Sequence, residues 1–446
     1  MAKSRSVVWP QKKQWLDWHS LLGITTGLMM FIICWSGTFA TISLELDWLL
    51  NSDIRSNATQ VDNTDLLAAY QAVQRTSPAA QIIRIDELAS ANYSLSVLYK
   101  SEQGALTHAF FDPHSQRLSG TTSFLTVSRF FRDFHMSLFG FYGIGKYLVC
   151  IFAVSLMASL ISILFFYKPT LKRFFEFPAT SSTRAFWGSL HRLLGLWSIW
   201  FLLVIGITGV WYLFEQTRND ILDGRFSYTD TFSNAVYQLP EPAAGMALSL
   251  QQLTLAAQNA MPELDIKEIT LNRGGYVYFA GQTDSSLLVR NRANKIYIEP
   301  STGNATYVQR ATDLPAYWYW SNMADPLHFG NFGGWITKTL WVIFGLLLSF
   351  LSLSGSWMYI KRLAGRPQRI NRKLLKNTIV VSLLIGGLTL VMGALRINAM
   401  LPVVNGQRII EIPMPVATFL LLWTLITGII CLVWGRWLLR ASLPTN

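Results

Sequence analysis

Six stretches of this chain are apolar enough to cross a lipid bilayer, and they constrain its fold more than any other feature. Crossing about 30 Å of hydrocarbon takes roughly 20 apolar residues in a helix. The stretches that meet this length are 18–44, 138–167, 187–214, 335–360, 377–399 and 414–437. Backbone groups in lipid have no water to bond, so each stretch must be a helix. The sequence therefore predicts a polytopic α-helical membrane protein with six transmembrane helices.

Basic residues gather in the four segments that we expect on one side of the membrane. Segments 1–14, 168–185, 361–376 and 436–446 hold seventeen Lys and Arg against Glu176 alone, a net charge of +16 in a chain whose total is +12. Because basic loops stay in the cytoplasm, both termini are expected inside and the two long connections outside. The net positive charge of the chain therefore reflects its membrane topology and does not indicate nucleic-acid binding. Contact of these loops with anionic lipid headgroups is a further alternative.

The two long outer connections repeat one predicted order of elements, a helix and then a small antiparallel sheet. The helices are Thr64–Arg75 and Leu248–Ala260, and the strands are Gln81–Ile85, Tyr93–Tyr99, Thr107–Phe111, Asp265–Leu271, Gly275–Ala280 and Ser286–Ile298. The last predicted strand of each set is followed by an acidic residue and a proline, at Asp112-Pro113 and Glu299-Pro300. Proline pre-sets one dihedral of a turn. We therefore expect two small α+β domains outside the membrane.

This interpretation assigns every residue to a span, an outer domain or a cytoplasmic segment. The cytoplasmic segments are 1–17, 168–186, 361–376 and 438–446, the spans are the six stretches given above, the outer domains are 45–137 and 215–334, and a short outer loop covers 400–413. Cys34, Cys150 and Cys431 all lie inside predicted spans, so we expect them to be packing residues without a disulfide.

Two of the spans resemble copies of one another. Trp18-His19-Ser20-Leu21-Leu22-Gly23 aligns with Leu190-His191-Arg192-Leu193-Leu194-Gly195, and the same register aligns Gly37-Thr38 with Gly209-Val210 without a gap. The outer domains repeat as well, so the chain reads as two copies of helix, outer domain and helix, followed by two further helices. An internal duplication of this kind predicts a pseudo-symmetric core.

Four of the six histidines lie at ends of predicted spans. His19 and His191 share the cytoplasmic depth, while His135 and His328 each open a span at the outer face. Ionisable residues in a span are costly and usually functional. Neutral imidazole is a common axial ligand of haem, and two such ligands leave an electron-transfer centre without an open position. The pattern predicts two haem b groups, an inner one at His19 and His191 and an outer one at His135 and His328. The alternative is that these four histidines bind no haem and only extend their polar rings toward the membrane surface.

Glycines and arginines beside the histidines extend this prediction. Gly23 and Gly195 lie four residues after their histidines, on the same helix face, where a flat macrocycle could approach the backbone. Close helix–helix contact would also favour glycine there. Arg192, Arg129 and Arg132 adjoin ligand positions and could bind haem propionates through paired hydrogen bonds, or anchor the chain at the interface.

The remaining motifs limit the function. His108 and His114 fall in an outer strand and turn, where we expect solvated side chains. No Gly-x-Gly-x-x-Gly follows a predicted strand, so no nicotinamide or flavin domain is indicated and electrons must come from another molecule. No catalytic side chain is indicated either.

The duplicated His-x-Leu-Leu-Gly helices, the acidic-Pro turns and the outer domains together resemble the PepSY-associated transmembrane proteins, over roughly residues 10–365. That family includes inner-membrane iron-siderophore reductases with b-type haem. The resemblance implies a haem-dependent oxidoreductase that takes electrons from quinol or a cytoplasmic reductase and reduces a periplasmic acceptor, ferric iron in a siderophore chelate, for iron uptake. The alternative is a non-catalytic membrane sensor or a peptidase-regulating PepSY protein whose histidines are structural.

Overall fold

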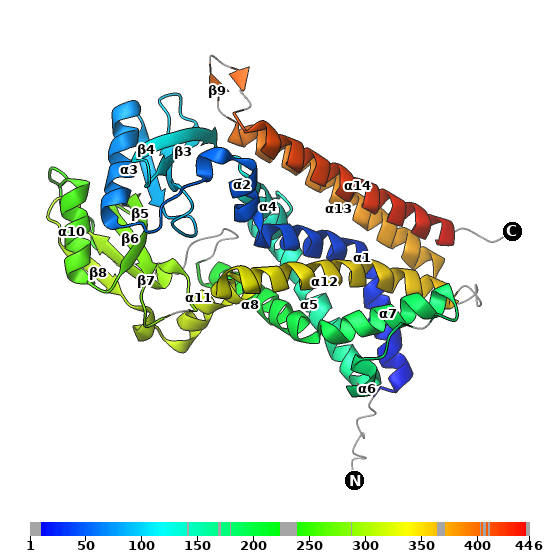
Figure 1. Cartoon of the computed structure of the whole chain (residues 1–446). Coiled ribbons are helices and arrows are strands. Elements are labelled where there is room, and N and C mark those ends of the chain that lie inside the picture. The colour runs from blue at the N-terminus through cyan, green and yellow to red at the C-terminus, as the bar shows by residue number, and fades with distance from the viewer. Residues whose placement is uncertain are drawn as a thin grey trace, which may run out of the picture.

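The computed structural model describes residues 10–140, 142–167, 171–178, 180–223, 239–286, 288–363, 371–401, 403–404, 407–408 and 411–442. Five of the basic residues used to predict topology lie outside these ranges, namely Lys3, Arg5, Lys168, Arg366 and Arg369. Figure 1 shows a bundle of long helices with a sheet and two covering helices at one end.

Six helices in the described ranges are long and apolar enough to cross a membrane. They are α1 (Lys12–Thr41), α5 (Tyr142–Phe166), α8 (Ile199–Asp223), α12 (Gly334–Leu363), α13 (Arg372–Met400) and α14 (Met414–Ser442). The predicted six-helix membrane architecture is confirmed. One predicted span, 187–214, is divided at Ser198 into α7 (Thr183–Trp197) and α8, so that only α8 is long enough to cross by itself.

Short helices precede or follow the spans. Helices α2 (Ser43–Leu50), α4 (Val127–Ser137) and α11 (Ala316–Phe329) lie at the sheet end of the bundle, and α6 (Leu171–Phe174) lies at the opposite end (Figure 1). α4 and α11 end in left-handed residues, Leu138 with φ 51° and Gly330 with φ 67°. A left-handed residue stops a helix and redirects the chain. His135 and His328 therefore lie on α4 and α11, before the turn, and the prediction that they open the following spans is wrong.

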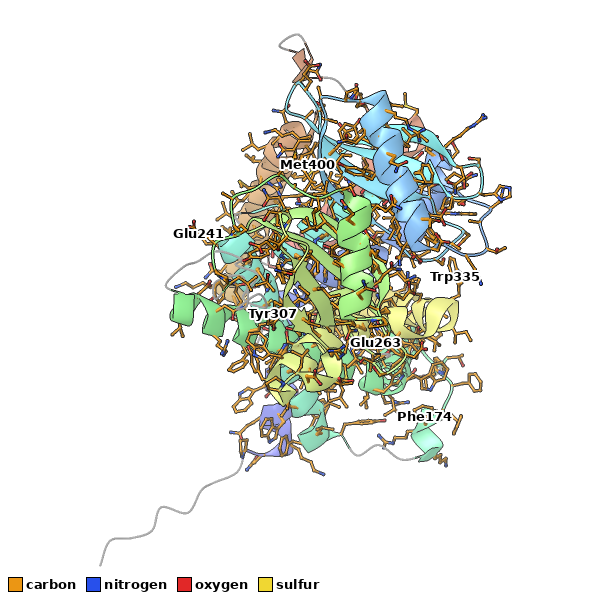
Figure 2. The ribbon with its side chains drawn as sticks, turned by 90° about the vertical axis from the view of Figure 1, so that its left-hand side faces the viewer. Phe174, Glu241, Glu263, Tyr307, Trp335 and Met400 are labelled. Carbon is orange, nitrogen blue, oxygen red and sulfur yellow. The ribbon has the colours of Figure 1, made fainter. Side chains whose placement is uncertain are left out.

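The two predicted outer domains share one antiparallel sheet. Its strands are β1 (Gln81–Asp86), β2 (Leu95–Lys100), β3 (Leu106–Asp112), β4 (Arg117–Ser123), β5 (Asp265–Arg273), β6 (Tyr276–Gln282), β7 (Asn294–Ile298) and β8 (Ala305–Gln309). The order is β4-β3-β2-β1-β5-β6-β7-β8, and β1 joins β5 with Ile85 opposite Ile269. Helices α3 (Asn63–Thr76) and α10 (Leu250–Ala260) cover one face over a single apolar core, and they lie in front of the strands in Figure 2.

Each half of the sheet has four strands where the sequence predicted three. The Asp112-Pro113 and Glu299-Pro300 turns lead into β4 and β8, so they are hairpin turns inside the sheet. Both added strands lie at the edges of the sheet. β4 consists mostly of polar residues, so it lacks the alternation of apolar and polar residues that identifies a strand. The predicted strand Ser286–Ile298 is confined to β7 because a 3₁₀ turn at Asn291–Ala293 precedes it.

Candidate functional site

Two cavities lie inside the bundle, each bordered by two of the span-end histidines. His19 and His191 line the inner cavity, and His135 and His328 line the outer one. One face of α1 forms a wall of both cavities, through positions 19, 22, 23, 26, 27 and 30 and then 30, 33, 34, 37, 38 and 41. These steps of three and four residues follow the helical repeat. The histidines therefore meet in the pairs that the sequence predicted.

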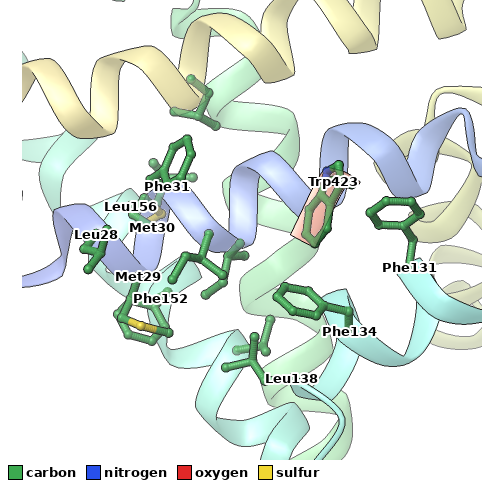
Figure 3. Close-up of a cluster of buried hydrophobic side chains, with 14 of the residues drawn as sticks. Leu28, Met29, Met30, Phe31, Phe131, Phe134, Leu138, Phe152, Leu156 and Trp423 are labelled. Carbon is green, nitrogen blue, oxygen red and sulfur yellow. The ribbon is translucent and has the colours of Figure 1, made fainter. Parts of the chain in front are cut away.

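A thin apolar layer separates the two cavities. Met30 from α1, Leu156 from α5 and Leu348 from α12 line both of them, and Met30 and Leu156 lie close together in Figure 3. Along α1, His19 is seventeen residues from Ser36, which contacts His135, and this corresponds to about 25 Å at the helical rise. The two histidine pairs are thus too far apart for one pair to serve both cavities.

The rings of His135 and His328 are separated by a distance that suits a shared metal. Their centroids are 6.2 Å apart, with planes inclined by 38°. Two imidazoles on opposite sides of one metal need roughly 2 Å from metal to nitrogen and roughly 1 Å from nitrogen to ring centre on each side, about 6 Å in all. The outer pair therefore has the spacing of two axial ligands.

The Nδ1 atom of each outer histidine is held by its own repeat. His135 Nδ1–H donates to the carbonyl oxygen of Ile33 at 3.0 Å, with the Ser36 hydroxyl 3.2 Å away. His328 Nδ1 lies 2.7 Å from Thr208 Oγ1, a hydroxyl that also bonds the carbonyl of Val204. The Ile33 carbonyl only accepts, so Nδ1 of His135 is a donor; a Thr208 hydroxyl that donates to Val204 accepts from His328 Nδ1 in the same way.

The inner pair is held in the same way. His19 Nδ1 lies 2.9 Å from Ser159 Oγ and 3.3 Å from the carbonyl oxygen of Ser159. His191 Nδ1 lies 2.8 Å from Ser354 Oγ, whose proton is donated to the Leu351 carbonyl. Within the described residues, no hydrogen bond reaches the Nε2 atom of any of these four rings. Metal-binding histidines show this arrangement, with one ring nitrogen fixed by a hydrogen bond and the other carrying a lone pair.

The hydroxyl partners are functional residues that the sequence interpretation missed. Ser36 directly precedes Gly37, and Thr208 directly precedes Gly209, so they occupy equal positions in the two repeats. A hydroxyl residue at one register of both duplicated helices was the signal that could have identified them. Ser159 and Ser354 are harder to find because α5 and α12 show no comparable motif in sequence.

The predicted glycines border space on the side where a Cβ would lie, although the Gly23 carbonyl accepts from Ser356 Oγ of α12 at 2.9 Å. A Cβ atom built on Gly23 would have no neighbouring heavy atom within 4 Å, and one on Gly195 would meet only a Leu351 methyl group at 3.9 Å. Gly37 is different, because its Cβ would lie 2.7 Å from the His135 ring. Paired imidazoles, their fixed tautomers and these bare backbone faces together fit a flat macrocycle held by two histidines.

Only one of the predicted arginines lines a cavity. Arg132 borders the outer cavity. Arg192 instead forms an ion pair with Glu176 at 3.3 Å, and Arg129 pairs with Asp133 at 3.0 Å. Neither Arg192 nor Arg129 is among the described residues that line the cavities, so the structure does not bring these two predicted residues to the histidine pairs.

The outer cavity gains polar residues from the second half of the sheet. Arg290 and Arg292 from this half add positive charge to its wall, as does Lys146 of α5. Arg290 forms an ion pair with Asp325, and the Tyr212 hydroxyl donates to Asp325 at 2.5 Å while its ring packs against His328. Arg290 and Arg292 come from the loop before β7, so only the tertiary fold brings them to α11.

A polar cleft leads from the outer cavity toward the outside. Arg290, Arg292, Asp325 and Phe329 border both spaces, and the cleft lies between the second half of the sheet and α11. Its far wall carries further carboxylates, among them Glu263, labelled in Figure 2. A water-soluble molecule in this cleft would lie beside the helix that carries His328.

His108 is packed, contrary to the prediction of a solvated side chain. Its ring lies between those of Phe110 and Phe124, nearly parallel to both, with centroid distances of 6.2 and 5.7 Å. Nδ1 bonds the Ser96 hydroxyl at 2.9 Å. Burial, with smaller contributions from nearby arginines, lowers the pKa of His108 to about 4. His114 is exposed, as predicted.

We expect the outer sheet to lose stability as the pH falls from 6.5 to 4. The unfolded chain binds a proton at the ordinary pKa of 6.5 and the folded chain only near 4, so acid favours unfolding by on the order of 2–3 kcal/mol. Protection factors of the β3 amides, corrected for the intrinsic pH dependence of hydrogen exchange, should therefore fall over this range. His108→Gln should abolish that share of the pH dependence and His114→Gln should leave it unchanged. The opposite result would contradict the assignment.

Comparison with known proteins identifies one relationship. The family model of the PepSY-associated TM region matches residues 16–362. The match covers both histidine pairs and the whole shared sheet, and it ends before α13. No curated protein matches the chain.

Proposed function

The chain belongs to the PepSY-associated transmembrane family, and from this membership we propose that it is a membrane oxidoreductase with two bis-histidine haem b groups. Four imidazoles with Nδ1 bonded and Nε2 unbonded, paired across two cavities, are the observation that supports this most. Haem b held by two imidazoles supplies one-electron transfer without an open coordination position. The proposed direction is from the cytoplasmic side to a periplasmic acceptor.

The chain's own residues have distinct parts in this proposal. Ser159 and Ser354 hold the inner imidazoles in the tautomer whose Nε2 can ligate, and Thr208 does the same for His328. Gly23 and Gly195 leave the backbone bare for a flat group. The apolar layer between the cavities excludes water and ions from the path between the two pairs.

Ferric iron in a siderophore chelate is the proposed acceptor. One electron converts Fe³⁺ to Fe²⁺, which oxygen donors bind less strongly, so the metal becomes available for uptake. The polar cleft beside α11 offers both carboxylates and guanidinium groups to a water-soluble chelate. Electrons would enter from quinol or a cytoplasmic reductase, since the sequence indicates no nicotinamide-binding motif.

A spectroscopic experiment tests this proposal. Purified protein should show a low-spin bis-histidine b-type spectrum with about two haems per chain, as two ligand pairs require. After anaerobic reduction with dithionite and removal of the excess, a ferric siderophore should reoxidise it and release ferrous iron to a colorimetric chelator. Stable reduced spectra with several chelate classes would remove iron as acceptor. A folded, colourless protein would remove electron transfer and favour the sensor or peptidase-regulating alternative.

Orientation is a separate prediction. In a variant whose three cysteines are replaced by serine, Gln103→Cys and Ser285→Cys place thiols at exposed positions in the two halves of the sheet. Both should react with a membrane-impermeant maleimide in cells with a permeable outer membrane, because the positive-inside rule puts the sheet outside. Lys373→Cys, at the start of α13, should react only after the inner membrane is opened. The reverse labelling pattern would reverse the proposed direction of electron flow.

A further inference from the structure

The two outer histidines are supported differently. His328 lies on α11, which packs on α8. Trp341 of α12 contacts the last turn of α11. The Trp341 indole donates to the carbonyls of Leu327 and His328 at 3.1 Å each. Every one of these supports belongs to the second repeat. His135 lies on α4, which packs mainly on α5, α1 and α2. Side chains of the α13–α14 hairpin, which follows the end of the family match, add to this support.

An ion pair links α4 to α13. Asp133, two residues before His135, is buried and accepts from Arg396 Nε of α13 at 3.0 Å. Its other oxygen lies 3.0 Å from Arg129 of α4 itself. A buried carboxylate is costly unless it is paired, so α4 is stable in this position only while a cation of the hairpin or of α4 faces Asp133.

An aromatic cluster links α4 to α14. Trp423 of α14 lies against Phe130, Phe131 and Phe134 of α4, at centroid distances of 5.9, 4.9 and 5.4 Å and in edge-to-face geometry. Figure 3 shows Trp423 close to Phe131 and Phe134. Because these three rings follow the helical repeat, Trp423 fixes the rotation of α4 about its axis.

The turn after α4 also depends on the hairpin. Leu138 and Phe139 have φ values of 51° and 58°, a conformation that non-glycine residues rarely adopt. Such residues persist only when their surroundings hold them. The Phe139 ring lies against Gly393 of α13, where an added Cβ would approach its Cδ2 to 2.9 Å. Because Gly393 has no side chain, α13 leaves room for the Phe139 ring of this turn.

We propose that the α13–α14 hairpin is a positioning element for His135, with Arg396, Gly393 and Trp423 as its positioning residues. The proposal rests on the proposed function, since it assigns His135 to the outer haem. None of the three lines the outer cavity within the described residues, so they act through α4. The hairpin thereby sets the affinity and the reduction potential at the outer site and leaves the inner site unchanged.

The first test compares redox titrations and haem loss in four variants, Arg396→Ala, Arg396→Lys, Gly393→Leu and Arg436→Ala. Arg396→Ala should shift the midpoint potential of the outer haem and accelerate its loss to a haem acceptor protein by about tenfold, the lower end of the usual effect of removing an outer-sphere support. Arg396→Lys should restore both values in large part, because it keeps the cation. Arg436→Ala, at an exposed site on α14, is the matched control and should change neither. Unchanged outer-haem values in both Arg396→Ala and Gly393→Leu would overturn the proposal.

A second readout needs no haem and separates this inference from the proposed function. Hydrogen exchange of α4 amides should accelerate in Arg396→Ala and Gly393→Leu, while exchange of α11 amides should stay as in the wild type. Equal exchange of α4 in the variants and the wild type would overturn the positioning role. A wild-type protein that contains no haem would overturn the proposed function. Faster α4 exchange in the two variants than in that haem-free wild type would still support the hairpin as the support of α4.

Discussion

His135→Ala and His328→Ala should each remove the same outer haem, or convert it to a high-spin form, while the inner haem stays low-spin and reducible. The two rings face one cavity at a separation suited to one metal, and no other described histidine lines that cavity. His19→Ala and His191→Ala should affect only the inner haem. Haem content per chain and reduced absorption spectra of the purified variants measure both outcomes.

Electron delivery distinguishes the two sites further. All four variants should fail to pass electrons from the cytoplasmic side to an outer acceptor, because the pairs are about 25 Å apart along α1 by the helical rise. Inner-site variants that are reduced chemically should still reduce the acceptor, and outer-site variants should not. His114→Ala, which changes an exposed histidine, serves as control. If His19→Ala and His135→Ala remove one and the same haem, the pairing is wrong.

Gly23→Leu should abolish the inner haem and leave the protein folded. A side chain at this position would project into a space with no heavy atom within 4 Å of its Cβ, and we assign that space to the macrocycle. Gly428→Leu is the matched control, since its Cβ also has no neighbour within 4 Å but lies on the exposed face of α14. Haem content and thermal stability of both variants should be measured together.

The two readings of Gly23 predict different results. If glycine serves only close helix–helix contact, Gly23→Leu should lower thermal stability while both haems remain. If glycine leaves room for a haem, the inner haem should disappear with little change in the stability of the protein without haem. Retention of two haems in Gly23→Leu would exclude the assignment of this face to the macrocycle.

Features carried by long or repeated patterns could be predicted from the sequence. The apolar length of the spans is a local property, so six helices follow directly. The pairing of His19 with His191 followed from a duplication that places both at one depth. The division of the third span at Ser198 could not be predicted, because the residues on both sides of it, 193–197 and 199–205, show no polar or proline break.

Features that depend on contacts between distant segments could not be predicted. Ser159 and Ser354 have ordinary helical surroundings in sequence, and only the packing of α5 on α1 and of α12 on α7 turns them toward imidazole rings. Arg290 reaches the outer cavity from a loop of the sheet. The hydrogen bonds that join β1 to β5 link residues nearly two hundred positions apart, as Ile85 and Ile269 show, and no local periodicity reports them.

The shared sheet also orders the biogenesis of the protein. β1 ends at Asp86, and its central partner β5 begins only at Asp265, after α5, α7 and α8 have entered the membrane. During synthesis the first half must therefore remain with an unpaired edge, the kind of edge that invites wrong pairing. The Arg84–Asp86 ion pair on β1 places charge on that unpaired edge, and charge there discourages association with other chains. The two halves of the duplicated chain are thus separate during translocation and become one folding unit only when the second half arrives.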